Sequence, residues 1–266
     1  MPISMVCQHF LRIPRGSACF RFLIAVEAEA ALRSSDMVKG PRTNEQSPSS
    51  VLQWVRPPRQ GRTREQLGRI LEAAEQLVSQ QGFDRVSVSE IAAAARTSVG
   101  GFYRRFPTKE SLLHALHERF CEEAKVTASA VLAPDRWRGI PTPAVLQALV
   151  DFLIDVYQER QGLFRAILVR AISDSAANQR SRELFDHLAA HMGALLQERR
   201  GDFEHPDPRL GAPFVLRVMF GTLNHFLMLP ELREFPRAVL QRELARVLRT
   251  YLGVRAPHMA TVRIRS

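Results

Sequence analysis

The sequence predicts an all-α fold, and three observations lead to this prediction. Apolar residues recur with the period of a helix in most segments after residue 60. The boundaries carry helix signals: Ser87 and Glu90 have the spacing of a capping box, and Pro107 ends a short helix. No segment is a convincing strand, and no internal repeat is found. We therefore expect a chain of helices joined by loops.

The first clear helix is expected over residues 62–80. Gly82 is placed to end it as the C′ residue, and Phe83 would fold back as the accompanying hydrophobic contact. One face of this helix is apolar, so it would cover the two helices that follow. The residues of this face are Leu67, Ile70, Leu71, Ala74, Leu77 and Val78.

Two short helices joined by a tight turn are predicted between residues 87 and 107. Ser87 would cap the first, and residues 95–97 form the break. Ser98 would cap the second, with Val99 or Gly100, Phe102 and Phe106 facing inward. Two short capped helices with such a turn form the helix-turn-helix pattern, whose second helix enters the major groove of DNA.

This stretch resembles the DNA-binding domain of the tetracycline-repressor (TetR) family of bacterial regulators. The family pattern departs at Arg96 and Thr97, where Gly and Val are usual, and Arg96 would be strained if that position needs a positive φ. The matching residues, in order and spacing, are Ile91, Ala92, Ala95, Ser98, Gly100, Tyr103, Phe106, Pro107, Lys109 and Glu110.

The resemblance implies a set of DNA contacts. Tyr103 and Lys109 would bind phosphate, the latter at the start of the next helix, where free backbone N–H groups help. The alternative is that Tyr103 belongs to the core and Lys109 is only solvated. Ser87 and Ser98 are caps whose hydroxyls could also meet phosphates. The base edges would face Val99, Gly101 and Phe102, and Arg96 and Arg104 are expected as direct readers or phosphate clamps.

The remainder of the chain is predicted to be helical. A long helix over 108–133 would link the DNA-binding part to the rest, as in the family. Further helices are expected over 143–160, 162–172, 176–200, 209–229 and 235–252. The 209–229 helix is apolar nearly all round, and with the last helix it would form a dimer interface. The middle helices would enclose an apolar effector pocket, with candidate lining residues Phe152, Tyr157, Phe164, Met192 and Asn224.

Charge and cysteine usage agree with a regulator of this kind. The net charge of +10 suits a polyanionic partner, although charge alone does not define a fold. Three cysteines without CxxC spacing predict neither a disulfide framework nor structural zinc, and they fit the reducing cytoplasm. No apolar run reaches the length of about 20 residues that a membrane span needs.

Residues 1–60 do not resemble the family. Residues 34–60 are rich in Ser, Pro, Arg and Gln, and the extension is expected to be a disordered basic segment. Two alternatives stay open: a later start at Met37, or a basic arm that reaches DNA. The predicted domains are a DNA-binding domain over 61–108, an effector-binding and dimerisation domain over 109–254, and a basic tail over 255–266.

No catalytic or metal site is predicted. His187 and His191 are four residues apart on one helix, but Asp186 does not share their face and no third ligand is obvious. The sequence contains no Gly-rich phosphate loop and no nucleophile elbow. We predict a homodimeric, ligand-responsive repressor that binds a palindromic operator and needs no cofactor. The alternative is an all-α ligand-binding protein or enzyme without a DNA role.

Overall fold

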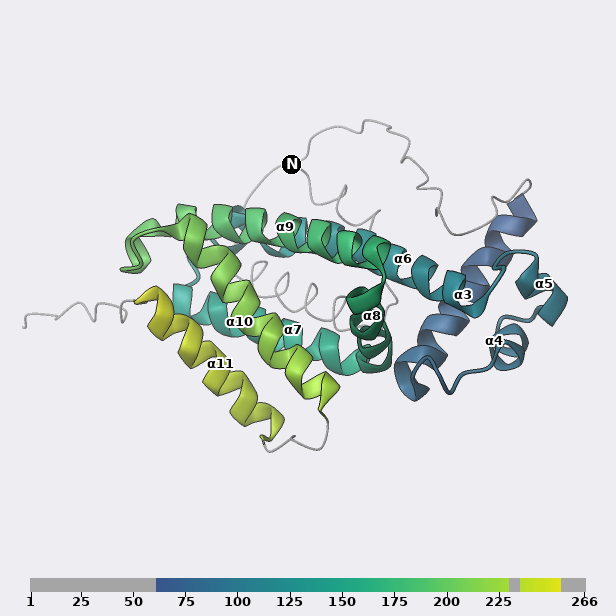
Figure 1. The fold of residues 1–266 in the computed structure, drawn as a ribbon. Helices are drawn as coiled ribbons and strands as arrows, with labels where there is room; N and C mark the ends of the chain where they lie inside the picture. Colours follow the sequence, from purple (N-terminus) through teal and green to yellow (C-terminus); the bar gives the residue numbers. More distant parts are fainter. Residues whose placement is uncertain (1–60, 230–234, 255–266) are drawn as a thin grey trace, which may run out of the picture. The chain divides into compact units, whose positions relative to one another are not determined.

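The computed structural model describes residues 61–229 and 235–254, and it confirms the predicted fold class. All regular elements in these ranges are helical, and only Phe203 and Val254 form an isolated β-bridge. The predicted extension 1–60 and tail 255–266 lie outside the described residues. The α-helices are α3 (Gly61–Gln81), α4 (Val88–Ala94), α5 (Val99–Tyr103), α6 (Lys109–Val131), α7 (Thr142–Glu159), α8 (Gln161–Ser173), α9 (Ser175–Glu198), α10 (Pro208–Met228) and α11 (Arg237–Leu252) (Figure 1).

The helix boundaries follow the predicted signals closely. Gly82 has a φ of +86°, a conformation that glycine adopts without steric cost, and Phe83 is buried beside it. Two short 3₁₀ helices were not predicted: Pro134–Trp137, and Arg200–Asp202, which begins at the last residue of the helix expected over 176–200. Phe235 was predicted to open the last helix, but α11 begins at Arg237, after Pro236.

The described residues form two compact units. The first contains 61–127 and 155–185, and the second contains 128–154, 186–229 and 235–254. The predicted boundary after residue 108 therefore does not coincide with a boundary between compact units, because α8 packs directly on α3. As a division of function, that boundary stays a prediction.

In the first unit, α3 packs on α4 and α4 packs on α5 (Figure 1). The predicted apolar face of α3 is confirmed at its centre, where Ile70 and Ala74 are fully buried. Ile91 on α4 and the Phe102 and Phe106 rings complete this small core, each with no exposed surface. Only a few side chains of this core attach α5 to the rest of the unit.

In the second unit, α10 and α11 lie side by side (Figure 1). A buried tryptophan anchors the loop before α7: Trp137 Nε1 donates a hydrogen bond of 2.6 Å to the Val131 carbonyl oxygen. Arg199 donates to the carbonyl oxygen of Ile140 and to the hydroxyl of Thr142, both at 2.9 Å. The bonds to Val131 and Ile140 satisfy backbone carbonyl groups.

Arg96 has a φ of +52°, the only positive φ of a non-glycine residue among the described residues. This confirms the strain expected where the family has glycine. Arg96→Gly should raise the free energy of unfolding by about 0.5–1 kcal/mol, since glycine adopts this conformation freely. The measurement is chemical denaturation. Arg104→Gly is the control: Arg104 has a φ of −64°, so its replacement should lower stability instead. Equal changes in the two variants would contradict the strain argument.

Candidate nucleic-acid interface

Helix α4 starts at the predicted capping box. The Glu90 backbone N–H donates to Ser87 Oγ at 3.2 Å, and the Ser87 backbone N–H donates to Glu90 Oε2 at 2.7 Å. The Ser87 hydroxyl and N–H both stabilise the carboxylate and so lower the pKa of Glu90. The two donors at the start of α4 are satisfied reciprocally, which fixes where the helix begins.

The turn between α4 and α5 is held by side chains of α3. Gln66 Nε2 donates to Thr97 Oγ1 at 2.6 Å, and Arg69 Nε donates to the Ala95 carbonyl oxygen at 3.3 Å. The Thr97 backbone N–H also bonds the Ala92 carbonyl oxygen at 2.9 Å. The residue that replaces the usual valine, Thr97, thus supplies an acceptor that ties the turn to the first helix.

Ser98 caps helix α5 as predicted: its Oγ accepts a hydrogen bond of 3.0 Å from the Gly101 backbone N–H. The buried residues of the helix are Gly101 and Phe102. Their side of the helix packs on the core, so their contact with base edges stays a prediction that the burial of both residues does not support. A Cβ at Gly101 would lie 2.4 Å from Thr97 Oγ1, so a side chain there would require Thr97 to move.

The outer face of α5 carries the remaining predicted readers. Val99 is 41% exposed and Tyr103 47% exposed, and Arg104 is also exposed. The expectation that Val99 or Gly100 packs inward is thus wrong, and so is the alternative that Tyr103 belongs to the core. Gly100 was absent from the predicted contacts. A Cβ there would have only Ser98 Oγ near it, at 4.0 Å, so DNA could approach the backbone closely.

Lys109 lies at the start of α6, beside the loop that follows α3. Its Nζ is 4.4 Å from the centre of the Phe83 ring and 3.5 Å from the Asp84 carbonyl oxygen. Thr108 and Ser111 cap the helix reciprocally: the Ser111 N–H bonds Thr108 Oγ1 at 3.1 Å, and the Thr108 N–H bonds Ser111 Oγ at 3.0 Å. The ammonium therefore rests on the loop before α4, close to the first residues of a capped helix.

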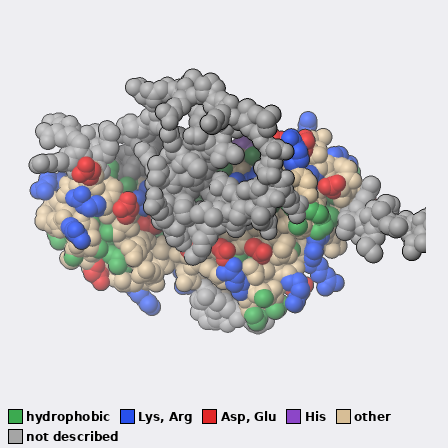
Figure 2. Space-filling model, turned by 180° about the vertical axis from the view of Figure 1, so that it is seen from behind, with side chains coloured by type: hydrophobic (Ala, Val, Ile, Leu, Met, Phe, Trp, Pro, Cys, Tyr) green, Lys and Arg blue, Asp and Glu red, His purple; other side chains and the backbone are tan. Residues whose placement is uncertain are grey.

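Charge on the surface does not by itself mark a DNA-binding face. On the side that Figure 2 shows, Lys and Arg side chains lie among Asp and Glu side chains over the described residues. The candidate interface is therefore defined by the geometry of α4, the turn and α5. Its exposed predicted residues are Ser87, Arg96, Ser98, Val99, Tyr103 and Arg104, with Lys109 partly exposed beside them.

The candidate effector residues are described unit by unit. In the first unit, the Phe164 ring packs on Tyr157 and Phe120, with ring centres 4.6 and 4.9 Å apart. Burial raises the pKa of the Tyr157 phenol. In the second unit Met192 is buried, whereas Phe152 and Asn224 are half-buried. Their role as a pocket stays a prediction.

Three histidines lie within hydrogen-bond distance of serine hydroxyls. His187 and His191 lie with their Nε2 atoms 3.0 and 3.2 Å from Ser129 Oγ. Burial, followed by the charge of His187, lowers the pKa of His191. In the first unit, His117 Nε2 lies 3.3 Å from Ser181 Oγ. Over the described ranges, no three His, Cys, Asp or Glu residues are grouped to hold a metal ion.

A capped pair of short helices, with the outer face of the second exposed, defines a helix-turn-helix DNA-binding protein. Two family models match this chain: residues 70–116 match bacterial regulatory proteins of the tetR family, and residues 141–252 match the tetracyclin repressor-like C-terminal domain. The two matches together span more than half of the sequence. The chain belongs to the TetR family, whose members are ligand-responsive DNA-binding regulators.

Known relatives agree with this assignment. The nucleoid occlusion factor SlmA of Escherichia coli is 27% identical over 156 residues, which are 57% of this chain and 77% of SlmA. A tetR-family regulator from Streptomyces coelicolor has the same fold, with a TM-score of 0.57 and 22% identity over 71% of this chain and 80% of its own. Pseudomonas aeruginosa NalD, the secondary repressor of the MexAB-OprM efflux pump, has a TM-score of 0.53 and 19% identity over 72% of this chain and 98% of its own.

None of the described helices combines the length and apolar character that a membrane crossing requires.

Proposed function

We propose that the protein is a homodimeric repressor that binds a palindromic operator and releases it when a small-molecule effector binds. The observation that carries this proposal is the exposed outer face of α5, held by Ser98 and by the buried Phe102. One such helix contacts only a few base pairs, so two copies must act together to give useful specificity. Residues 61–108 would bind DNA, and residues 109–254 would dimerise and bind the effector.

Exposed apolar residues on α10 and α11 support the dimer. Leu210 is 60% exposed and Phe214 45% exposed on α10, and Val247 is 46% exposed on α11. Large apolar side chains gathered on two neighbouring helices favour contact with another protein surface. A second copy of the chain is the partner that a palindromic operator requires.

The test is selection of bound duplexes from random double-stranded DNA, followed by sedimentation of the selected complex. We expect a palindromic consensus with half-sites about 10 base pairs apart, or a multiple of that spacing, and two chains per duplex. Failure to enrich any sequence would reject the operator-binding proposal and favour an all-α ligand-binding protein or enzyme. One chain per duplex would reject the dimer alone.

Replacing Lys109 tests the phosphate contacts directly. Lys109→Ala should weaken binding to operator and to unrelated DNA equally, because a phosphate contact carries no sequence information. The slope of log K against log salt concentration should become shallower by about one unit per half-site. Glu110→Ala is the control, since it removes a neighbouring charge that is not a phosphate ligand. An unchanged slope for Lys109→Ala would remove this residue from the interface.

The effector is proposed to act on α6, because this helix continues directly from the DNA-binding part of the chain. An effector that favours the released state by a few kcal/mol is sufficient to free the operator. By reciprocity, saturating operator should weaken effector binding by the same factor. Phe152→Trp or Met192→Trp should narrow the proposed pocket. Either change should reduce the loss of operator affinity that the effector causes and leave DNA binding without effector intact. Equal effector affinity with and without operator would reject this mechanism.

A further inference from the structure

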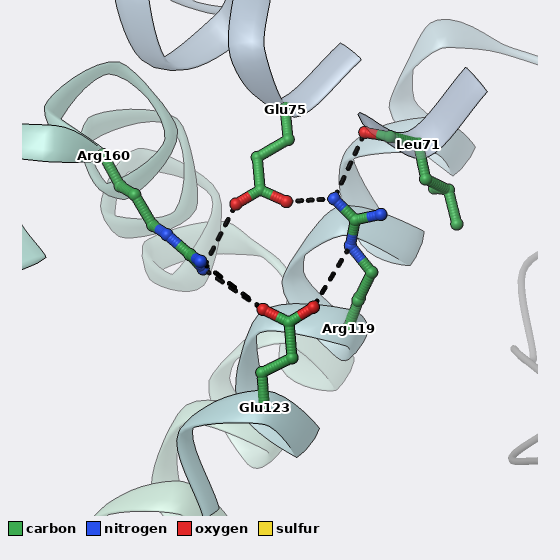
Figure 3. A network of polar contacts seen from close by, with 5 residues as sticks. All are labelled: Leu71, Glu75, Arg119, Glu123 and Arg160. Carbon is green, nitrogen blue, oxygen red and sulfur yellow. Dashed lines mark hydrogen bonds and ion pairs between the residues drawn. The ribbon is translucent and has the colours of Figure 1, made fainter. Parts of the chain in front are cut away.

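Four charged side chains from distant parts of the sequence form one network within the first unit (Figure 3). Arg160, between α7 and α8, lies 3.2 Å from Glu75 Oε1 on α3 and 3.5 Å from Glu123 Oε2 on α6. Arg119 on α6 pairs with Glu75 and lies 3.7 Å from Glu123 Oε1. It also donates to the Leu71 carbonyl oxygen at 3.3 Å. The two carboxylates and two guanidinium groups therefore join α3 and α6 to the residue that precedes α8.

The network is partly shielded from water, and Arg119 and Glu123 are 21% and 26% exposed. Arg160 is 11% exposed and Glu75 16% exposed. Burial raises the pKa of Glu123, against the opposing effect of Arg119 and Arg160. Removing one partner of such a group leaves a poorly compensated charge in a buried place. Loss of the Arg160 contacts should therefore cost more stability than loss of a surface ion pair.

Close beside this network, the first turn of α8 touches the end of α3 backbone to backbone. A Cβ at Gly162 would lie 2.1 Å from the Val78 carbonyl oxygen and 2.9 Å from that of Ser79. It would also lie 3.1 Å from the Gly82 nitrogen. Only glycine permits this approach, because each of these neighbours is backbone and cannot swing away.

The segment that Gly162 contacts leads directly to the candidate DNA-binding face. Gly82 is followed by Phe83 and Asp84, on which the Lys109 ammonium rests. From the other end of α3, Gln66 and Arg69 bond the turn before α5. A displacement of α3 would therefore move both the turn that presents α5 and the support of Lys109.

We propose that Arg160 and Gly162 are positioning residues for the DNA-binding helices, and that they fix α3 to the start of α8. This inference rests on the proposed operator-binding function. These contacts belong to the packing of α8 on α3, so the DNA-binding helices are held to α8 as well as joined to α6. Two attachments therefore set their orientation. Orientation matters because two copies must enter successive major grooves at once.

The test compares the affinity for the selected palindromic duplex with that for an unrelated duplex. Gly162→Ala should lower the ratio of these affinities by about fivefold or more. The reason is that misoriented DNA-binding helices cannot contact both half-sites at once. Affinity for unrelated DNA and its salt slope should stay unchanged. Gly201→Ala is the control, because a Cβ at Gly201 has no atom within 4 Å.

Arg160 variants keep the proposal testable if Gly162→Ala does not fold. Arg160→Gln should also lower the ratio by about fivefold or more. Arg160→Lys should restore part of it, because an ammonium keeps the charge but cannot span both carboxylates as a guanidinium does. Arg165→Gln is the control: it removes an exposed positive charge from α8, five residues after Arg160.

The affinity ratio separates positioning from a purely structural role. Loss of folded protein weakens both affinities by the same factor and leaves their ratio unchanged. A constant ratio in Gly162→Ala, or in Arg160→Gln if the former does not fold, would overturn the proposal. If the unaltered protein shows no preference for any duplex, the proposed function fails, and the inference fails with it.

Discussion

Phe102→Ala is expected to destabilise the DNA-binding helices by about 3–5 kcal/mol and to abolish binding to every duplex. Phe102 has no exposed surface. The centre of its ring lies 5.3 Å from the centre of the Phe106 ring and 5.4 Å from that of the Tyr103 ring. The only other buried residue of the five-residue α5 is Gly101. One phenylalanine therefore supplies most of the apolar attachment of this helix, because a glycine buries no side chain.

The neighbouring residue provides the matched control for this prediction. Tyr103→Phe keeps the ring and removes only the exposed hydroxyl, so the free energy of unfolding should change little. DNA affinity should fall by about tenfold per half-site if the hydroxyl bonds a phosphate. Chemical denaturation and titration with labelled duplex measure the two effects. A folded, DNA-binding Phe102→Ala variant would contradict the assigned role of the buried ring.

Local signals in the sequence predicted the boundaries of this DNA-binding region well. Ser87 with Glu90, and Ser98 with the backbone N–H of Gly101, make the expected caps. Gly82 has the expected positive φ. These features depend on residues within three or four positions of each other, so the sequence contains all the information that determines them.

The facing of α5 was predicted incorrectly because the helix is too short to define an apolar side. Over five residues, α5 makes less than one and a half turns, so periodicity cannot distinguish Val99 from Gly101. The tertiary contacts decide instead: Thr97, bonded to Gln66, fills the space in which a side chain at position 101 would lie.

The network around Arg160 had no counterpart in the predictions. Its members come from α3, α6 and the start of α8, and no local pattern links them. The same limit applies to the candidate effector residues, since a pocket depends on how helices pack. Sequence reasoning therefore located the DNA-binding helices, but not the contacts that orient them.

A second large effect is expected from a buried histidine on α6. His117 is 3% exposed and lies 3.3 Å from Ser181 Oγ. Burial is the main cause that lowers the pKa of His117 to about 4, and the positive charges of Arg180 and His114 add to it. The folded protein therefore keeps this imidazole neutral at pH values where an unfolded chain, with a histidine pKa of about 6.5, binds a proton.

The sign of the pH effect follows from this difference. Above about pH 6.5 both states are neutral at His117, and its contribution to stability is complete. As pH falls from about 6.5 toward 4, only the unfolded state gains the proton, so the free energy of unfolding should decrease by about 3 kcal/mol from this residue alone. Carboxylates that titrate in the same range add their own effects, so the test must compare variants.

His117→Gln removes the titration and keeps a group that can bond Ser181. Between pH 6.5 and 4, the decrease in its free energy of unfolding should therefore be about 3 kcal/mol smaller than the decrease in the unaltered protein. His225→Gln, at an exposed position on α10, is the control for the substitution itself. Denaturant titrations at several pH values measure all three proteins. Parallel profiles for His117→Gln and the unaltered protein would show that the folded state protonates His117 as readily as the unfolded chain does.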